Sequence, residues 1–220
     1  ISMKISIVTD TSDNIKELSN ITLPNKEGYS SKHGYIFHCR EFNYERFNEF
    51  ILDHMMFTLD VMKSSDVVMT CGADVMFTNW NIKIEDVLLF NDNILIAKEN
   101  TGWWPINNDV MIWRCNPRVI EFYERLINDF PVWRNYPWRT QAHLWNIKQE
   151  EPKVGSIMRL VEPEVMNQHP SKWQLGNWII HMYNMDIKSK VTQAMAINNV
   201  ITNGNPVWKV EHVNIKPQTA

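Results

Sequence analysis

Short runs of apolar and β-branched residues recur along the chain, and polar or turn-forming segments separate them. Runs of this length and composition are typical of buried β-strands. We predict such strands at residues 4–9, 35–39, 66–71, 93–98, 110–115, 157–161 and 178–183.

Several segments between these runs carry apolar residues at helical spacing. The pattern is clearest in residues 44–63, which we predict to form an amphipathic helix. Residues 117–129 and 140–147 have the same spacing, and a shorter helix over 29–34 is expected to end at Gly34.

The alternation of strands and helices predicts an α/β fold with a mostly parallel mixed sheet covered by helices on both sides. Such sheets bind ligands beyond the carboxyl ends of their strands. Asp10, Asp74 and His181 stand at or near predicted strand ends, so they are the first candidates for a functional site.

Length and composition are those of one globular domain over residues 1–220. The chain is 44% hydrophobic and 21% charged, and its net charge of -3 gives no basic excess for binding nucleic acid. No apolar stretch is long enough to span a bilayer. Residues 1–2 look like a cloning remnant, and we interpret 209–220 as a tail or a linker to further C-terminal domains.

Three cysteines, Cys39, Cys71 and Cys115, have no metal-binding or redox spacing. An odd number of cysteines without a secretory leader favours reduced thiols. We therefore expect a cytoplasmic protein.

Asp74 is the strongest single candidate for a functional residue, because it lies between two apolar runs, after Gly72 and Ala73. A carboxylate between buried strands is costly unless it is paired or binds a metal. The alternative is a turn aspartate that hydrogen-bonds nearby amides. His181 is either a metal ligand or a hydrogen-bonded core residue of its apolar strand.

Ten tryptophans are unusual for 220 residues. Most are expected to fill the core, but a tryptophan ring also suits stacking on a sugar. The adjacent pair Trp103 and Trp104 cannot both point into one core if the segment is extended, so we expect partial exposure. Trp138 is a further candidate for such a surface.

An ordered set of segments resembles the GT-A glycosyltransferases of the galactosyl, mannosyl and xylosyl transferase family, and within it the N-terminal domains of chlorella-virus glycosyltransferases. The segments span roughly residues 4–190. They are KISIVTD at 4–10, YSSKHGY at 29–35, VMTCGADVMFTN at 68–79, INNDVMIWR at 106–114, Gln141 and GNWIIH at 176–181.

The resemblance implies a GT-A fold and an enzyme of the hexosyltransferase type that moves a sugar from a UDP-sugar to a glycan acceptor, with retention of configuration. Mn²⁺, or Mg²⁺ in its place, would be held by Asp74 and His181. The resemblance further assigns uridine to Thr9 and Asp10, the diphosphate to Lys188, catalysis to Asp109, Asn108 and Gln141, and the sugar or acceptor to Trp103, Trp104, Asn107 and Trp138.

Three positions depart from the family pattern by losing a carboxylate: Gly72, Thr140 and Asn177. An inactive nucleotide-sugar or glycan-binding domain is therefore the alternative function. A phosphohydrolase is disfavoured by the lack of paired carboxylates after the first strand, and a dehydrogenase by the lack of a GxGxxG motif. If the protein is viral, capsid glycan synthesis in the host cytoplasm is the expected role.

Overall fold

The computed structural model describes residues 3–42, 47–99 and 104–203. A six-stranded sheet lies at its centre, in the order β2-β1-β3-β6-β5-β7. The strands are β1 (Ile5–Ser12), β2 (Ile36–Phe42), β3 (Val67–Cys71), β5 (Ile94–Lys98), β6 (Ile106–Arg114) and β7 (Met158–Val161).

The sheet is mixed, as predicted. β1 pairs in parallel with β2 and β3, and β5 pairs in parallel with β7. β6 runs antiparallel to both β3 and β5. Each predicted strand from the sequence is present, with its ends shifted by a few residues.

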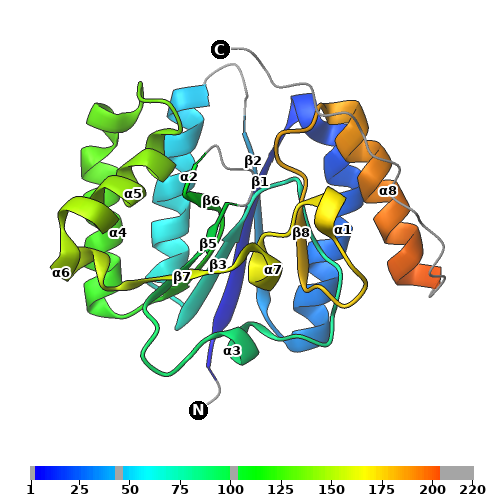
Figure 1. The fold of residues 1–220 in the computed structure, drawn as a ribbon, viewed down its shortest axis with the longest axis horizontal. Helices are drawn as coiled ribbons and strands as arrows, with labels where there is room; N and C mark the ends of the chain where they lie inside the picture. The colour runs from blue at the N-terminus through cyan, green and yellow to red at the C-terminus, as the bar shows by residue number, and fades with distance from the viewer. Residues whose placement is uncertain (1–2, 43–46, 100–103, 204–220) are drawn as a thin grey trace.

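Helices cover both faces of the sheet (Figure 1). One face carries α2 (Phe47–Met62), α4 (Pro117–Trp133), α5 (Arg139–Glu150) and the short α6 (Pro152–Gly155). The other carries α1 (Lys16–His33), which packs against α8 (Ile187–Asn203). Short helices α3 (Ile84–Val87) and α7 (Pro163–Met166) lie in the connections.

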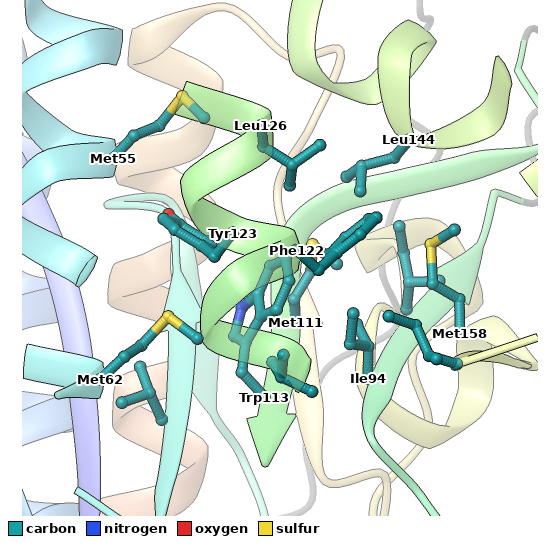
Figure 2. Packing of buried hydrophobic residues seen from close by; sticks show 14 of the residues in the cluster. Met55, Met62, Ile94, Met111, Trp113, Phe122, Tyr123, Leu126, Leu144 and Met158 are labelled. Atoms are coloured by element: carbon teal, nitrogen blue, oxygen red, sulfur yellow. The ribbon is translucent and has the colours of Figure 1, made fainter. Parts of the chain in front are cut away.

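The larger core lies between the sheet and the α2, α4 and α5 layer (Figure 2). Phe122 and Tyr123 of α4 are buried there together with Trp113 of β6, whose ring meets that of Tyr123 edge to face. This is the apolar face that the helical spacing of residues 117–129 predicted.

A second, two-stranded sheet is formed by β4 (Val75–Phe77) and β8 (Ile179–His181), which are antiparallel. Val75 is the cross-strand partner of His181. This pairing brings the segment after β3 to a strand about a hundred residues later in the sequence, which is what places the candidate site.

Helix α1 is longer than the predicted helix over 29–34, although it ends as expected, with Gly34 in the left-handed region at φ 71°. Part of its buried face is polar. Thr22 and Lys26 both donate to the Ala73 carbonyl, and the Asn25 side chain bonds both backbone groups of Phe77. Apolar periodicity could not find a helix that is buried through polar groups.

Helix α8 follows the predicted last strand and was not expected from the sequence. In the part of the chain that the structure describes, no helix combines the length and apolarity that crossing a bilayer requires. Residues 1–2, Trp103 and residues 209–220 lie outside the described residues.

Candidate functional site

Asp74 lies between β3 and β4, at the carboxyl end of β3. The neighbouring strand β8 ends in His181, and the backbone N–H of Met182 donates to the Asp74 carbonyl at 3.1 Å. The Asp74 and His181 side chains meet, with 3.2 Å between Asp74 Oδ1 and His181 Nε2. The structure therefore brings together two residues that are 107 positions apart.

Lys190 of α8 completes the surroundings of Asp74, with its Nζ 2.6 Å from Asp74 Oδ2. Burial alone would raise the pKa of Asp74. The charges of His181 and Lys190 outweigh that effect and hold the pKa of Asp74 far below its ordinary value. The carboxylate is thus fixed in its ionised form.

His181 is fully buried and is fixed from both ring nitrogens. Its Nδ1 lies 2.7 Å from Asn167 Oδ1, while Nε2 faces Asp74 and also Asp109, whose Oδ2 is 3.3 Å away. Burial opposes a charge on the ring, but the two carboxylates outweigh it and raise the pKa of His181 to about 9. At neutral pH the imidazole carries a proton that a bound metal would displace.

Asp109 belongs to β6, next to the end of β3. The Gly72 N–H donates to the Asp109 carbonyl at 3.0 Å, which continues the β3–β6 ladder by one further bond. The Asp109 N–H donates to Asn107 Oδ1 at 3.1 Å. Just over half of the Asp109 side chain, 54%, is exposed, so this carboxylate connects the buried pair to solvent.

The start of α5 is tied to β6 beside Asp109. Asn108 Nδ2 donates to Thr140 Oγ1 at 2.8 Å, and the Asn108 N–H points to Gln141 Oε1 at 3.4 Å. Gln141 is buried, and within the described part of the chain its Nε2 has no hydrogen-bond partner. The predicted residues Asn107, Asn108, Asp109 and Gln141 therefore form one group.

Two tryptophans lie on the other side of this group. Trp138 immediately precedes α5, is 49% exposed and stacks on Trp104, with ring centroids 4.9 Å apart and planes 17° apart. Trp138 and Arg139 have φ values of 57° and 36°, a region that side-chain-bearing residues rarely adopt. Partial exposure was expected for Trp103 and Trp104; Trp104 is partly exposed, and Trp103 lies outside the described residues.

Thr9 and Asp10, the residues expected to contact uridine, lie near the end of β1. The Asp10 carboxylate lies 3.0 Å from His54 Nδ1 of α2, and Thr9 is fully buried. Burial lowers the pKa of His54, but Asp10 outweighs it and raises that pKa overall. Asp10 therefore already has an imidazole neighbour, which the sequence did not indicate.

Lys188 is exposed on the first turn of α8, and Lys190 is the lysine that contacts Asp74. The two lysines are two residues apart on one helix, and nothing in the sequence indicates which of them contacts Asp74. Asn177 accepts a hydrogen bond from the Gln174 N–H at 2.7 Å and so supports the tight turn before β8.

Comparisons with known proteins give structural matches only. Neither protein-family models nor curated protein sequences match the chain. A glycosyltransferase involved in glycosylation of the major capsid of PBCV-1 matches with a TM-score of 0.75 and 16% identity, over 88% of this chain and 99% of that one.

Two further solved structures agree. The galactosyltransferase LgtC, in complex with donor and acceptor sugar analogues, matches with a TM-score of 0.57 and 10% identity, over 90% of this chain and 96% of that one. A mutant of Drosophila β1,4-galactosyltransferase 7, in complex with manganese, UDP-Gal and xylobiose, matches at 0.51 and 14%, over 83% and 71%.

The chain has the GT-A fold. This confirms the fold that the sequence resemblance implied, including the mixed central sheet. Within the GT-A fold, the Asp74, Asp109 and His181 side chains come from three different strands or strand ends and converge at one edge of the sheet.

The side chains at this edge, one imidazole and two carboxylates, are of the types that bind divalent cations. Two atoms that bind one metal at right angles, each about 2.1 Å from it, are about 3.0 Å apart. The Nε2-to-oxygen separations of 3.2 and 3.3 Å are close to that value, and buried Nε2 has no hydrogen-bond partner among the described residues. In those residues no three His, Cys, Asp or Glu side chains already surround one metal position. A metal would therefore have to enter between groups that now contact each other.

Proposed function

We propose that the protein is a glycosyltransferase of the hexosyltransferase type that moves a sugar from a UDP-sugar to a glycan acceptor and depends on Mn²⁺ or Mg²⁺. The observation that carries the proposal is the convergence of Asp74 and His181 at the carboxyl edge of a GT-A sheet. A mixed carboxylate and imidazole set favours Mn²⁺ over Mg²⁺.

The chemistry follows from the leaving group. Cleavage of the anomeric C–O bond leaves a nucleoside diphosphate with additional negative charge, and a divalent metal bound by Asp74 and His181 would stabilise that charge. Lys190 lies 2.6 Å from Asp74 and Lys188 is exposed on the same helix, so each can supply a cation to the diphosphate. We keep Thr9 and Asp10 as the proposed uridine contacts, with His54 holding the Asp10 carboxylate in place.

The donor sugar would lie over the group formed by Asn107, Asn108, Asp109 and Gln141, where the Asp109 carboxylate is partly exposed. Gln141 Nε2, which has no hydrogen-bond partner among the described residues, can donate to a sugar hydroxyl. On the far side of this group, the stacked Trp104 and Trp138 offer a flat surface to the acceptor. Trp103 belongs to the same proposal but lies outside the described residues.

We also propose retention of anomeric configuration, which requires no strong general base at the acceptor. A capsid glycan is the proposed acceptor because the PBCV-1 protein acts in capsid glycosylation. The host cytoplasm is then the proposed location.

The competing function is an inactive nucleotide-sugar or glycan-binding domain. The observation in its favour is that Asp74 is already neutralised by His181 and Lys190, while Gly72 supplies no second carboxylate. Binding without turnover would result if the metal could not displace these cations.

Thermal unfolding with UDP, GDP, CMP and a panel of UDP-sugars, each with Mn²⁺, Mg²⁺ or chelator, tests the proposal. A ligand that binds only the folded protein raises the unfolding temperature by mass action. Stabilisation by UDP with Mn²⁺, and release of UDP from one UDP-sugar, are the expected results. Equal stabilisation by GDP, or full UDP binding in chelator, would contradict the nucleotide and metal assignments. UDP-sugar binding without any turnover would favour the inactive domain.

A further inference from the structure

The imidazole of His181 contacts two carboxylates that come from different strands. Its Nε2 is buried, faces Asp74 Oδ1 and Asp109 Oδ2 at 3.2 and 3.3 Å, and makes no hydrogen bond within the described ranges. Asn167 occupies the other ring nitrogen. A buried nitrogen aimed between two carboxylates has the position of a metal ligand rather than of a core residue.

Gly72 explains why Asp109 can come so close. Its N–H bonds the Asp109 carbonyl, so residues 72 and 109 are neighbours across the β3–β6 ladder. A Cβ atom at position 72 would lie 3.8 Å from Asp109 Cβ and 3.0 Å from Asp74 Oδ1. A side chain at position 72 would therefore begin in contact with both Asp74 and Asp109, so a carboxylate at position 72 and the carboxylate of Asp109 would reach the same neighbourhood.

We propose that Asp109 supplies the second carboxylate of the divalent-cation site, in place of the one that Gly72 lacks. The site then consists of Asp74, Asp109 and His181, and it rests on the proposed metal-dependent function. The loss of a motif carboxylate in the sequence is compensated in space from the neighbouring strand.

The charges around the site favour this arrangement. Asp74 is balanced by Lys190 on one oxygen, so Asp74 alone offers little net negative charge to a divalent ion. Asp109 restores a full negative charge, and the exposure of its side chain leaves room for solvent or diphosphate oxygens as the remaining ligands. Hard cations such as Mn²⁺ and Mg²⁺ require oxygen ligands of this kind.

The test is Mn²⁺ affinity, measured from the electron paramagnetic resonance signal of free Mn²⁺, with and without UDP. Asp109→Asn and Asp74→Asn are each expected to weaken Mn²⁺ binding by at least about tenfold, the lower limit for loss of even an outer-shell partner. The matched control is Asp129→Asn, which removes a carboxylate that lies 3.4 Å from His143 Nε2, remote from the site on α4. This variant should bind Mn²⁺ as the wild type does.

The double variant Gly72→Asp/Asp109→Asn returns the carboxylate to β3. The new Cβ meets only the flexible end of Asp74 closely, so a small side-chain shift accommodates it. Recovery of Mn²⁺ affinity relative to Asp109→Asn is expected, with folding of each variant checked by circular dichroism. A double variant no better than Asp109→Asn would overturn the inference.

The single variants separate this inference from the proposed function. If Asp74→Asn weakens Mn²⁺ binding and Asp109→Asn does not, the metal site stands but Asp109 is not part of it. If neither variant changes Mn²⁺ affinity, the metal site itself is misplaced and both proposals fail.

Discussion

Two regions that flank Asp109 are built on opposite physical principles. On one side, His181 is fully buried, Asp74 is mostly buried, and each charge is balanced by a neighbour. On the other side, Trp138 is half exposed and its backbone is held at a positive φ. In the first region, burial and ion pairs fix the positions of the charged groups. In the second, a strained backbone keeps a flat apolar ring at the surface.

The difference matches what each region is proposed to bind. A small cation and a diphosphate need a few charged atoms at fixed positions, where a low dielectric strengthens the interaction. A sugar ring offers an apolar face and many exchangeable hydroxyls, and an exposed aromatic plane suits it. Substitutions at four positions, with Gln168 as a control, test this division, and the largest effect is expected on the charged side.

Asp74→Asn should reduce turnover by about a hundredfold or more, as when a transition-state electrostatic contact is lost. The structure also predicts a loss of stability, by about 1–3 kcal/mol, because the buried His181 and Lys190 lose a charged partner. Initial rates and urea unfolding measure the two effects. Near-normal turnover would show that the metal does not bind at Asp74.

Substitution of Asn167 tests whether Mn²⁺ binding depends on the orientation of the His181 ring as well as on the charges around it. Its Oδ1 accepts from His181 Nδ1 and so leaves Nε2 facing the carboxylates. Asn167→Leu should weaken Mn²⁺ binding by about 10–100-fold, the usual cost of losing a partner behind a metal ligand. Asn167→Asp, which keeps the acceptor, should retain the affinity.

The adjacent buried amide Gln168 provides the control for Asn167. Its Nε2 donates to the Lys172 carbonyl, so Gln168→Leu also removes a buried amide from this segment. We expect it to lower stability and leave Mn²⁺ affinity unchanged. Equal losses of affinity in the Asn167 and Gln168 leucine variants would reduce Asn167 to a structural residue.

The sequence predicted the sheet and helices α2, α4 and α5 because these elements follow apolar periodicity. It also placed Asp74 and His181 at strand ends, where ligands bind in such folds. It could not predict Lys190 and Asn167 as their neighbours, or His54 as the neighbour of Asp10, because these contacts depend on which segments the tertiary structure brings together. Helix α1 shows the same limit, since the residues that bury it against β4 are polar.

Substitution of Trp138 tests the region of the stacked tryptophans. The two variants differ in the backbone strain that the positive φ at position 138 imposes. Both Trp138→Ala and Trp138→Gly remove the ring, and each should weaken acceptor use by about 0.5–1.5 kcal/mol, a factor of roughly 2–13. Glycine adopts the positive φ freely, whereas alanine does not. The glycine variant should therefore be more stable than the alanine variant by about 1 kcal/mol.

Acceptor KM and the rate of UDP-sugar hydrolysis without acceptor separate the possible outcomes for Trp138. A raised KM with unchanged hydrolysis is expected. Equal effects on both reactions would place the ring at the donor, and no effect on either would remove it from the site.

Lys26 is a buried charged residue of α1 that contacts the residue before Asp74. Its substitution should have the smallest effect on function. Lys26 is fully buried, and its Nζ donates to the Ala73 carbonyl, which also accepts from Thr22. Lys26→Met replaces a buried charge with an apolar chain of similar size, which is often stabilising. We expect a gain of about 1 kcal/mol at neutral pH, because Thr22 still satisfies the carbonyl.

The pH dependence distinguishes this charge effect from simple repacking. Burial lowers the pKa of Lys26 below 10.5 in the folded protein, so between the lowered value and 10.5 the unfolded chain binds more protons at this residue. Wild-type stability should therefore rise with pH across that window. The advantage of Lys26→Met should shrink over the same range and vanish above it, as measured by urea unfolding of both proteins at each pH. An advantage that stays constant with pH would mean that the Lys26 charge is already compensated, and that Asp74 and its loop are held by the hydrogen bonds of α1 alone.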